Sequence, residues 1–193
     1  MKRNQSSSSM GQYKTVRSEK LYDSFKESKK TDKPHADKTF LKRLIHVRRI
    51  ARTTGGGKKR SIWAMVVVGN GNGSAGYGEG RALDSANAVQ KATKDAQKNM
   101  ITIERFDNRT IFTDIDYKFG KVDLKLKTAP AGYGIVANNH IHEVCRCFGI
   151  RDISVKIRGS TNPMNVVKGT FEALQTQRSP QEIARVRGKS VVD

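Results

Sequence analysis

The sequence predicts an α+β fold made of two small α/β sandwich modules, and three observations support this. Segments rich in β-branched residues alternate with segments whose apolar residues recur every three or four positions, as strands and helices require. The order of these segments is β-β-β-α in the first module and β-β-α-β-α in the second. The chain has 193 residues, of which 36% are hydrophobic, and this low share favours a small or divided core.

The chain divides into four expected parts. The stretches NQSSSSM and KESKKTDKPHADK offer almost nothing apolar to bury, so the beginning of the chain is expected to be a basic, disordered or extended tail. The sequence SPQE near the end is a capping box that predicts a short helix with a basic end. The tail is expected over residues 1–40 and the first module over residues 41–104. The second module is expected over residues 110–178, and the short basic helix with its own tail over residues 179–193.

The first module is expected to contain three strands followed by a helix. LIHVRRIARTT is typical of a strand, GGGKKR of a loop, and SIWAMVVVG of a buried strand. The pairs Asn70-Gly71 and Asn72-Gly73 predict a tight turn, because both residue types tolerate positive φ, and SAGYGEG continues as a short third strand. The helix is expected over 81–100, where apolar residues recur at helical spacing. They are Ala82, Ala86, Val89, Ala92, Thr93, Ala96 and Met100.

The second module is expected to alternate strands with two helices. TIFTDIDYKFG, KVDLKLKTA and IRDISVKIRG are the strands, and ANNHIHEVCRCFG is a helix that stops at Gly149. NPMNVVKGTFEALQTQ is a second helix, with Asn162 as its N-cap and Pro163 in its first turn. The residues expected to face the core are Ile141, Val144, Cys145 and Phe148 in the first helix and Val166, Val167, Thr170, Phe171 and Leu174 in the second.

The glycines after the buried strand leave more than one interpretation open. Gly71, Gly73 and Gly76 spell G-x-G-x-x-G, the pattern of a dinucleotide-binding loop. That loop needs a helix beginning near the second glycine, and here residues 77–80 intervene and no parallel βαβ unit follows. We therefore favour a turn for Gly71 and Gly73. Close approach of RNA backbone or of a neighbouring protein is the weaker expectation for three further glycines, namely Gly76, Gly78 and Gly80.

The charge of the chain points to an acidic partner. The formal net charge is +19, and an excess of this size repels itself in a compact protein unless a partner neutralises it. Residues 1–60 hold 18 Lys or Arg and 5 Asp or Glu, a net +13, whereas the remainder of the chain carries only +6. A membrane is the poorer candidate, because no run of eighteen apolar residues exists and the apolar side of helix 81–100 is mostly Ala. Nucleic acid is the favoured partner.

The candidate RNA-binding residues lie on the first strand and the glycine loop after it. No acidic residue occurs between Lys38 and Glu79, and long cationic side chains in this segment are suited to replacing the counterions of a phosphate backbone. Glycines let the loop backbone approach RNA and donate its N–H groups. Such contacts favour recognition of RNA shape across a minor groove. The candidate residues are Arg48, Arg49, Arg52, Thr54, Gly55, Gly56, Gly57, Lys58, Lys59 and Arg60.

Other candidate sites are weaker. His140, His142, Cys145 and Cys147 have metal-binding residue types, but their spacing differs from the usual C-x₂₋₄-C, so we expect a core Cys145, exposed histidines and no metal. Two cysteines so close together predict no disulfide framework and a reducing compartment. Trp63 lies in an apolar strand and is expected in the core. The sequence holds no nucleophile–base–acid set, which predicts no enzyme, no cofactor and no small-molecule substrate.

Several segments together resemble the bacterial-type small-subunit ribosomal protein five family. They are LIHVRRIARTTGGGKKRSIWAMVVVGNGNGSAGYGEGRA, AVQKATKDAQKNM, APAGYGIVANN, GSTNPMNVVKGTFEAL and SPQEIARVRGKS, which occur in order over residues 42–190. The phrases NRTIFTDI and HEVCRCFGI resemble the mitochondrial branch. The chain departs from the family in having Gly55 in place of a Lys, Asn138-Asn139 in place of Gly-Gly and His142 in place of Arg.

The resemblance implies a double-stranded-RNA-binding-like first module and a place in the small ribosomal subunit. It implies contacts with small-subunit rRNA and with ribosomal proteins four and eight, a position near the mRNA where it enters, and a contribution to translational fidelity. It also implies a mitochondrial location, with the bacterial cytoplasm as the alternative. Two other functions stay open on the residues alone: a free-standing double-stranded-RNA-binding protein, and a nucleotide-dependent enzyme that uses residues 69–80.

Overall fold

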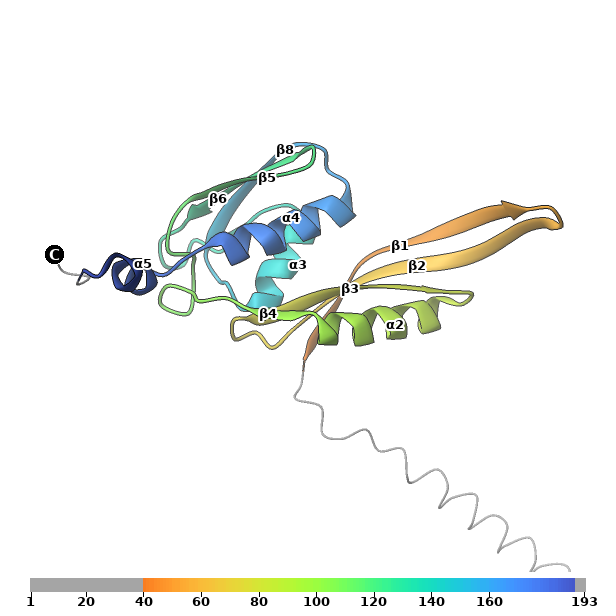
Figure 1. The fold of residues 1–193 in the computed structure, drawn as a ribbon, viewed down its shortest axis with the longest axis horizontal. Coiled ribbons are helices and arrows are strands. Elements are labelled where there is room, and N and C mark those ends of the chain that lie inside the picture. Colours follow the sequence, from red (N-terminus) through yellow and green to blue (C-terminus); the bar gives the residue numbers. More distant parts are fainter. Residues whose placement is uncertain (1–39, 190–193) are drawn as a thin grey trace, which may run out of the picture. The chain divides into compact units, whose positions relative to one another are not determined.

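A computed structural model describes residues 40–189, which form two four-stranded sheets and four helices (Figure 1). The strand orders are β1-β2-β3-β4 and β5-β6-β8-β7. The α+β class with two sheet-and-helix modules is thus confirmed. Apart from Phe40, the tail expected over 1–40 lies outside the described residues. Within the described part of the chain, none of the helices is long and apolar enough to cross a membrane.

The first sheet is antiparallel throughout and is dominated by a long β1–β2 hairpin. The expected loop GGGKKR is shorter than predicted, because Gly57 already begins the second strand and only Gly55 and Gly56 form the turn. A fourth strand of three residues was not predicted from the sequence. The strands are β1 (Leu41–Thr54), β2 (Gly57–Gly69), β3 (Ser74–Ala82) and β4 (Met100–Thr102).

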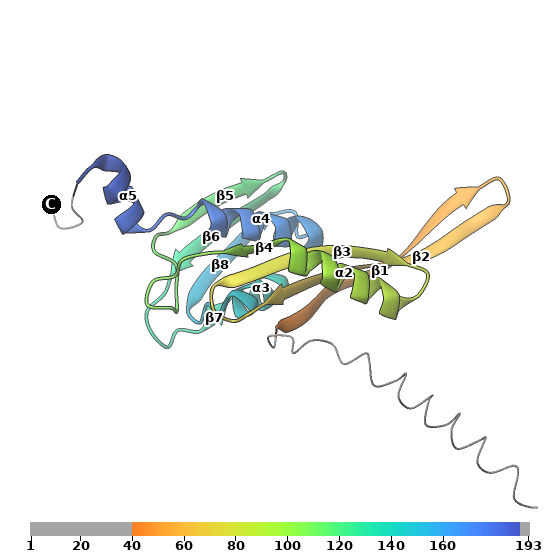
Figure 2. The same ribbon diagram turned by 60° about the horizontal axis from the view of Figure 1, so that its bottom comes forward.

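Helix α2 (Ser85–Lys98) covers one face of the first sheet (Figure 2). The range 81–100 predicted for it was too long at both ends, because residues 81 and 82 belong to β3 and Met100 begins β4. Its buried stripe is Ala88, Ala92 and Ala96, whereas Ala86 is exposed, so the predicted apolar face was partly wrong.

Alternate glycines of β3 let α2 pack directly on the strand. A Cβ atom at Gly76 would collide with backbone atoms of Ala96 and Asn99, and one at Gly78 or Gly80 would collide with the backbone of α2. The expectation that RNA or a neighbouring protein approaches these glycines was therefore wrong, since the chain's own helix occupies the space. At the β2–β3 turn the prediction is confirmed, because Gly71 and Gly73 have φ of +67° and +88°.

The second sheet carries one parallel strand that the sequence did not predict, the two-residue β7 beside β8. The two predicted helices are confirmed with their caps: Asn162 accepts a bond from the Met164 N–H, and Gly149 adopts the left-handed conformation. Ser179 begins the last helix by accepting from the Glu182 N–H. The elements are β5 (Ile115–Phe119), β6 (Val122–Thr128), β7 (Ile135–Val136), α3 (Asn139–Phe148), β8 (Ile153–Gly159), α4 (Pro163–Thr176) and α5 (Pro180–Arg187).

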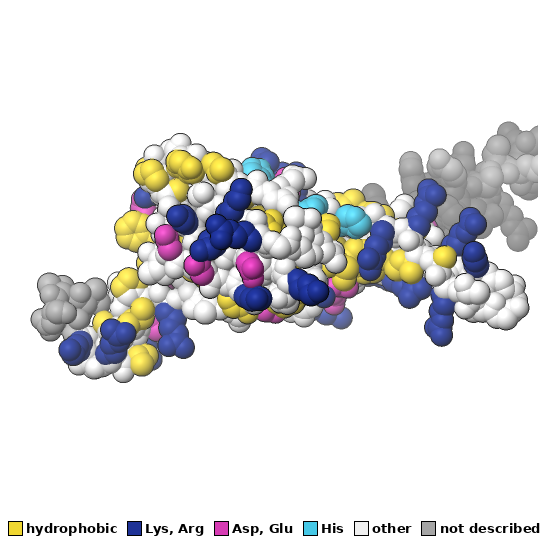
Figure 3. Space-filling model, turned by 90° about the horizontal axis from the view of Figure 1, so that it is seen from above, with side chains coloured by type: hydrophobic (Ala, Val, Ile, Leu, Met, Phe, Trp, Pro, Cys, Tyr) yellow, Lys and Arg dark blue, Asp and Glu magenta, His cyan; other side chains and the backbone are white. Residues whose placement is uncertain are grey.

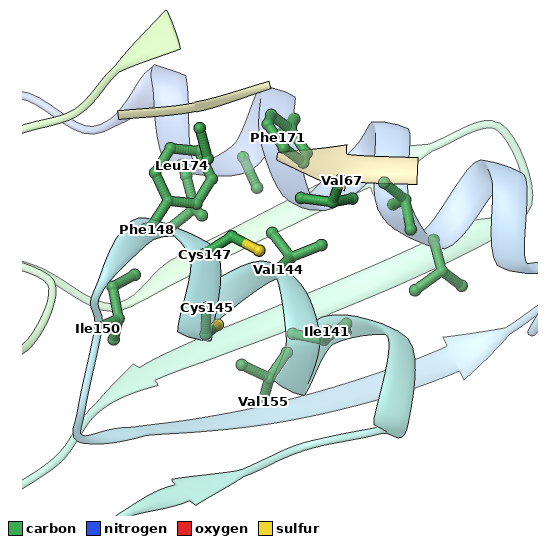
Figure 4. Packing of buried hydrophobic residues seen from close by; sticks show 14 of the residues in the cluster. Val67, Ile141, Val144, Cys145, Cys147, Phe148, Ile150, Val155, Phe171 and Leu174 are labelled. Carbon is green, nitrogen blue, oxygen red and sulfur yellow. The ribbon is translucent and has the colours of Figure 1, made fainter. Parts of the chain in front are cut away.

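One large hydrophobic cluster joins the two sheets, with α3 between them (Figure 4). Val144 and Cys147 of α3 lie toward Val67 of β2, while Ile141 lies toward Val155 of β8. Cys145 is buried as expected, but Cys147 is buried as well, because the first sheet covers the side of α3 on which it lies. A second, smaller cluster lies under α2.

Backbone hydrogen bonds fasten the β2–β3 turn to the end of α3. The Gly71 and Gly73 N–H groups donate to the carbonyls of Cys147 and Phe148, at 3.0 and 2.8 Å. Arg105 reinforces the contact by donating to the Gly149 carbonyl at 2.9 Å. These bonds satisfy carbonyls that the last turn of a helix leaves without partners.

Candidate nucleic-acid interface

The register of the β1–β2 hairpin distributes the six cations of its outer part, residues 48–60, over both faces. Residues directly opposite each other in an antiparallel pair project on the same side. Arg52 pairs with Lys59, and Arg48 lies four residues before Arg52 on the same face. The other face of the ribbon carries Arg49, Lys58 and Arg60. Further along the sheet, at Val66, helix α2 covers this same face. The sequence had indicated a single cationic strand and loop, and the structure instead gives a two-stranded ribbon with three cations on each side.

The outer part of the hairpin is exposed and lacks acidic side chains. All six cations are exposed, and none forms an ion pair within residues 40–189. Figure 3 shows Lys and Arg side chains gathered over this part of the molecule with no Asp or Glu between them. Cations that form no ion pair remain available to an external polyanion.

The glycine turn at the tip has open space around its backbone. A Cβ atom at Gly55, Gly56 or Gly57 would meet nothing within 4 Å, so packing does not require these glycines. The turn is closed by the Thr54 hydroxyl, which donates to the Gly57 carbonyl at 2.9 Å, and Gly57 has φ of +126°. The backbone is therefore accessible, and contact between it and RNA stays a prediction.

The base of the hairpin is anchored by Trp63, which is 7% exposed and thus in the core as expected. The Arg48 guanidinium lies 4.7 Å from the centre of the Trp63 ring, which supports a cation–π interaction and holds this side chain against the sheet. The indole N–H donates to Glu79 at 3.3 Å, and Glu79 also pairs with Lys168 of α4 at 2.7 Å. The bond to Glu79 raises the pKa of Lys168. The sequence did not identify this set of contacts, because its members lie on four separate elements, β1, β2, β3 and α4.

The residues considered for a metal do not form a metal centre. Within the described residues no group of three His, Cys, Asp or Glu side chains could hold an ion. Burial raises the pKa of both Cys145 and Cys147 to about 12, so neither thiol ionises near neutral pH. His140 is half-buried, and burial lowers its pKa, with a smaller contribution from His46.

A second cationic surface, which the sequence did not predict, surrounds a cavity of about 520 Å³ beside the β2–β3 turn. Arg105, Arg146 and Arg151 line it together with His142, and no Asp or Glu does. Burial lowers the pKa of Arg105, and the nearby charge of Arg151 lowers it further. Its guanidinium is already engaged by the carbonyl of Gly149 and the side chain of Asn72, which gives it a structural task.

Comparison with known families decides the relationship. The family model described as "Ribosomal protein S5, N-terminal domain" matches residues 40–104, and "Ribosomal protein S5, C-terminal domain" matches residues 117–187. The chain belongs to the ribosomal protein S5 family. Ribosomal protein S5 is a structural protein and not an enzyme, in agreement with the sequence prediction.

Curated S5 relatives come from a mitochondrial and a bacterial context. The chain is 47% identical over 160 residues to small ribosomal subunit protein uS5m of Schizosaccharomyces pombe, covering 81% of this chain and 41% of that protein. It is 40% identical over 157 residues to uS5 of Erythrobacter litoralis, covering 81% and 55%, and 38% identical over 157 residues to uS5 of Rhodospirillum rubrum, covering 81% and 79%. The chain thus spans about half the length of the first two relatives.

Proposed function

We propose that this S5-family chain is a structural constituent of the small ribosomal subunit that binds rRNA through the β1–β2 hairpin. The observation that carries the proposal is the outer part of the hairpin, residues 48–60. Its six cations are exposed, have no acidic residue between them and form no ion pair within residues 40–189. Its relatives are named small ribosomal subunit proteins, which supports the same place for this chain. The proposed RNA-contacting set is the predicted one, residues 48, 49, 52 and 54–60.

The mechanism is electrostatic anchoring on a rigid support. Arg and Lys side chains on both faces of the ribbon replace counterions on rRNA phosphates, and the open glycine turn lets the backbone approach the chain of nucleotides. The second module then packs against neighbouring proteins, for which we propose small-subunit proteins four and eight. In this position the protein would brace the side on which mRNA enters and support translational fidelity, without catalysis, cofactor or small-molecule substrate.

We also propose a mitochondrial ribosome as the location. The 47% identity to a mitochondrial S5 protein supports this. The bacterial relatives at 38–40% identity make the bacterial cytoplasm the alternative.

The test is incorporation of the tagged full chain into ribosomal particles, followed by sucrose-gradient sedimentation. We compare the wild type with a tip variant, Arg52→Glu/Lys58→Glu/Arg60→Glu. The matched control is a sheet variant that reverses the same number of exposed charges on the outer face of the second sheet, Lys127→Glu/Lys156→Glu/Arg158→Glu.

The wild type is expected to sediment with the small subunit, and the tip variant is expected to remain near the top of the gradient. Absence of the wild type from the small subunit would reject the proposed place in the ribosome. Equal incorporation of the tip variant and the wild type would reject the hairpin as the rRNA anchor.

A further inference from the structure

Three arginines from separate segments of the chain line the cavity of about 520 Å³ beside the β2–β3 turn. Arg105 comes from the loop after β4, Arg146 from α3, and Arg151 from the link between α3 and β8. His142 is a further wall residue that can carry positive charge, and no Asp or Glu lines the cavity. The fold therefore brings positive charge from three segments to one hollow.

This positive charge is not neutralised within the described part of the chain. None of the three arginines forms an ion pair there, and the exposed Arg146 and Arg151 side chains donate no hydrogen bond to another described residue. Glu143 lies 3.8 Å from His142, but its carboxylate is also bound by Arg43 at 3.1 Å and does not line the cavity. The two exposed guanidinium groups thus remain available to a ligand.

Arg105 is held in place at the wall of the cavity. Its guanidinium donates to the carbonyl of Gly149 and to the side chain of Asn72, both at 2.9 Å. Burial lowers its pKa, and the charge of Arg151 lowers it further, so the two guanidinium groups repel each other. An anion bound between them would relieve this repulsion, and Arg105 would not have to be reoriented to receive it.

The end of helix α3 does not oppose an anion in this place. The last turn of a helix exposes carbonyl groups and carries partial negative charge. Here the carbonyls of Cys147 and Phe148 accept hydrogen bonds from the β2–β3 turn, and the carbonyl of Gly149 accepts one from Arg105. The negative end of the helix is therefore covered, and the positive side chains determine the charge of the wall.

We propose that this cavity binds a compact anion with at least two phosphate groups, as carried by a nucleoside diphosphate or by free pyrophosphate. Guanidinium groups bind phosphate oxygens through paired hydrogen bonds, and the donors of Arg146 and Arg151 are available for this. The volume of the cavity is typical of small-ligand sites. A single carboxylate has too little charge for three arginines, and an RNA strand spreads its charge along a backbone, whereas a diphosphate concentrates it in one hollow.

The anion is a bound ligand and not a substrate. The inference uses none of the hairpin cations, so it does not rest on the proposed function. It adds a second anionic partner to a chain whose other cationic surface lies on the hairpin.

The test is isothermal titration calorimetry of the full chain with pyrophosphate at constant ionic strength, with ADP and citrate as parallel ligands. The cavity variant is Arg146→Gln/Arg151→Gln, which removes two exposed charges and leaves Arg105 in place. Its matched control is Arg185→Gln/Arg187→Gln, which removes two exposed arginines of α5. The tip variant of the hairpin is the second control, and circular dichroism checks that all variants are folded.

The wild type is expected to bind pyrophosphate at one saturable site, and its Tm should rise with the pyrophosphate concentration. The cavity variant is expected to bind about tenfold more weakly and to lose most of the rise in Tm, while both controls behave as the wild type does. Tighter binding of ADP than of pyrophosphate would identify a nucleotide as the source of the phosphates. Equal or weaker binding of ADP would identify free pyrophosphate, and either result supports the site.

Equal pyrophosphate affinity of the cavity variant and the wild type would overturn the proposal, as would equal losses in the cavity variant and its control on α5. Loss of binding in the tip variant would assign the anion to the hairpin and would overturn it too. The same holds if citrate binds as tightly as pyrophosphate, or if a single-stranded RNA oligomer at the same phosphate concentration displaces the pyrophosphate. All of these results leave the incorporation test of the proposed function standing.

Discussion

Replacing Gly78 by Ala is expected to destabilise the protein strongly, although it adds one methyl group. The new Cβ atom would overlap backbone atoms of Ala92 and Ala96 and would lie 2.9 Å from the Ala96 Cα atom. Real Cβ atoms almost never come within 3.0 Å of such neighbours. Because the atoms belong to the backbone of α2 and not to a flexible side chain, the helix must move as a body.

The free energy of unfolding is expected to fall by about 3 kcal/mol, which is the upper part of the range for overpacking a close-packed interior. For a chain of this size that corresponds to a fall in Tm of about 9 °C. Urea unfolding followed by circular dichroism measures the free energy of unfolding. An unchanged slope of this free energy against urea concentration would indicate that the substitution leaves the unfolded state unaffected.

Gly56→Ala is the matched control, since a Cβ atom there meets nothing within 4 Å. We expect it to change stability by less than about 0.5 kcal/mol. If Gly78→Ala were as stable as Gly56→Ala, the account of glycine-mediated contact between β3 and α2 would be refuted.

Three further outcomes are expected. The Gly134 N–H, and then Arg109, lower the pKa of Asp152, so its carboxylate stabilises the fold above the ordinary value of 3.8 and loses this effect as the pH falls. Asp152→Asn should therefore flatten the decline in unfolding free energy below about pH 4, and a decline as steep as in the wild type would contradict this. Cys145 and Cys147, with pKa of about 12, should not react with a thiol reagent at pH 8 in the folded protein but should react fully in guanidinium, whereas rapid labelling before unfolding would show that they are accessible. In RNA-binding titrations the tip variant should lower the slope of log K against log salt by about 1 for each lost phosphate contact, and the sheet variant should not.

Local signals account for the parts of the fold that the sequence predicted well. The caps at Asn162 and Ser179 and the left-handed Gly149 depend on neighbours within a few residues, and all three hold. Strands β4 and β7 escaped prediction because two or three residues carry no periodicity. They exist only because β3 and β8 offer partners.

The features of the candidate site that the sequence could not predict depend on which segments the fold brings side by side. The density of cations before Trp63 was visible in the sequence, but their division between two faces depends on the pairing of Arg52 with Lys59. The glycines of β3 were expected to admit a foreign backbone, and only the fold reveals α2 against them.

The bonds between the β2–β3 turn and the last turn of α3 have a consequence for biosynthesis. A nascent chain that has emerged only as far as α2 still lacks the carbonyls of Cys147 and Phe148, to which Gly71 and Gly73 donate. It also lacks the apolar residues that cover Val67. The amino-terminal half therefore cannot complete its interior until translation has passed residue 150.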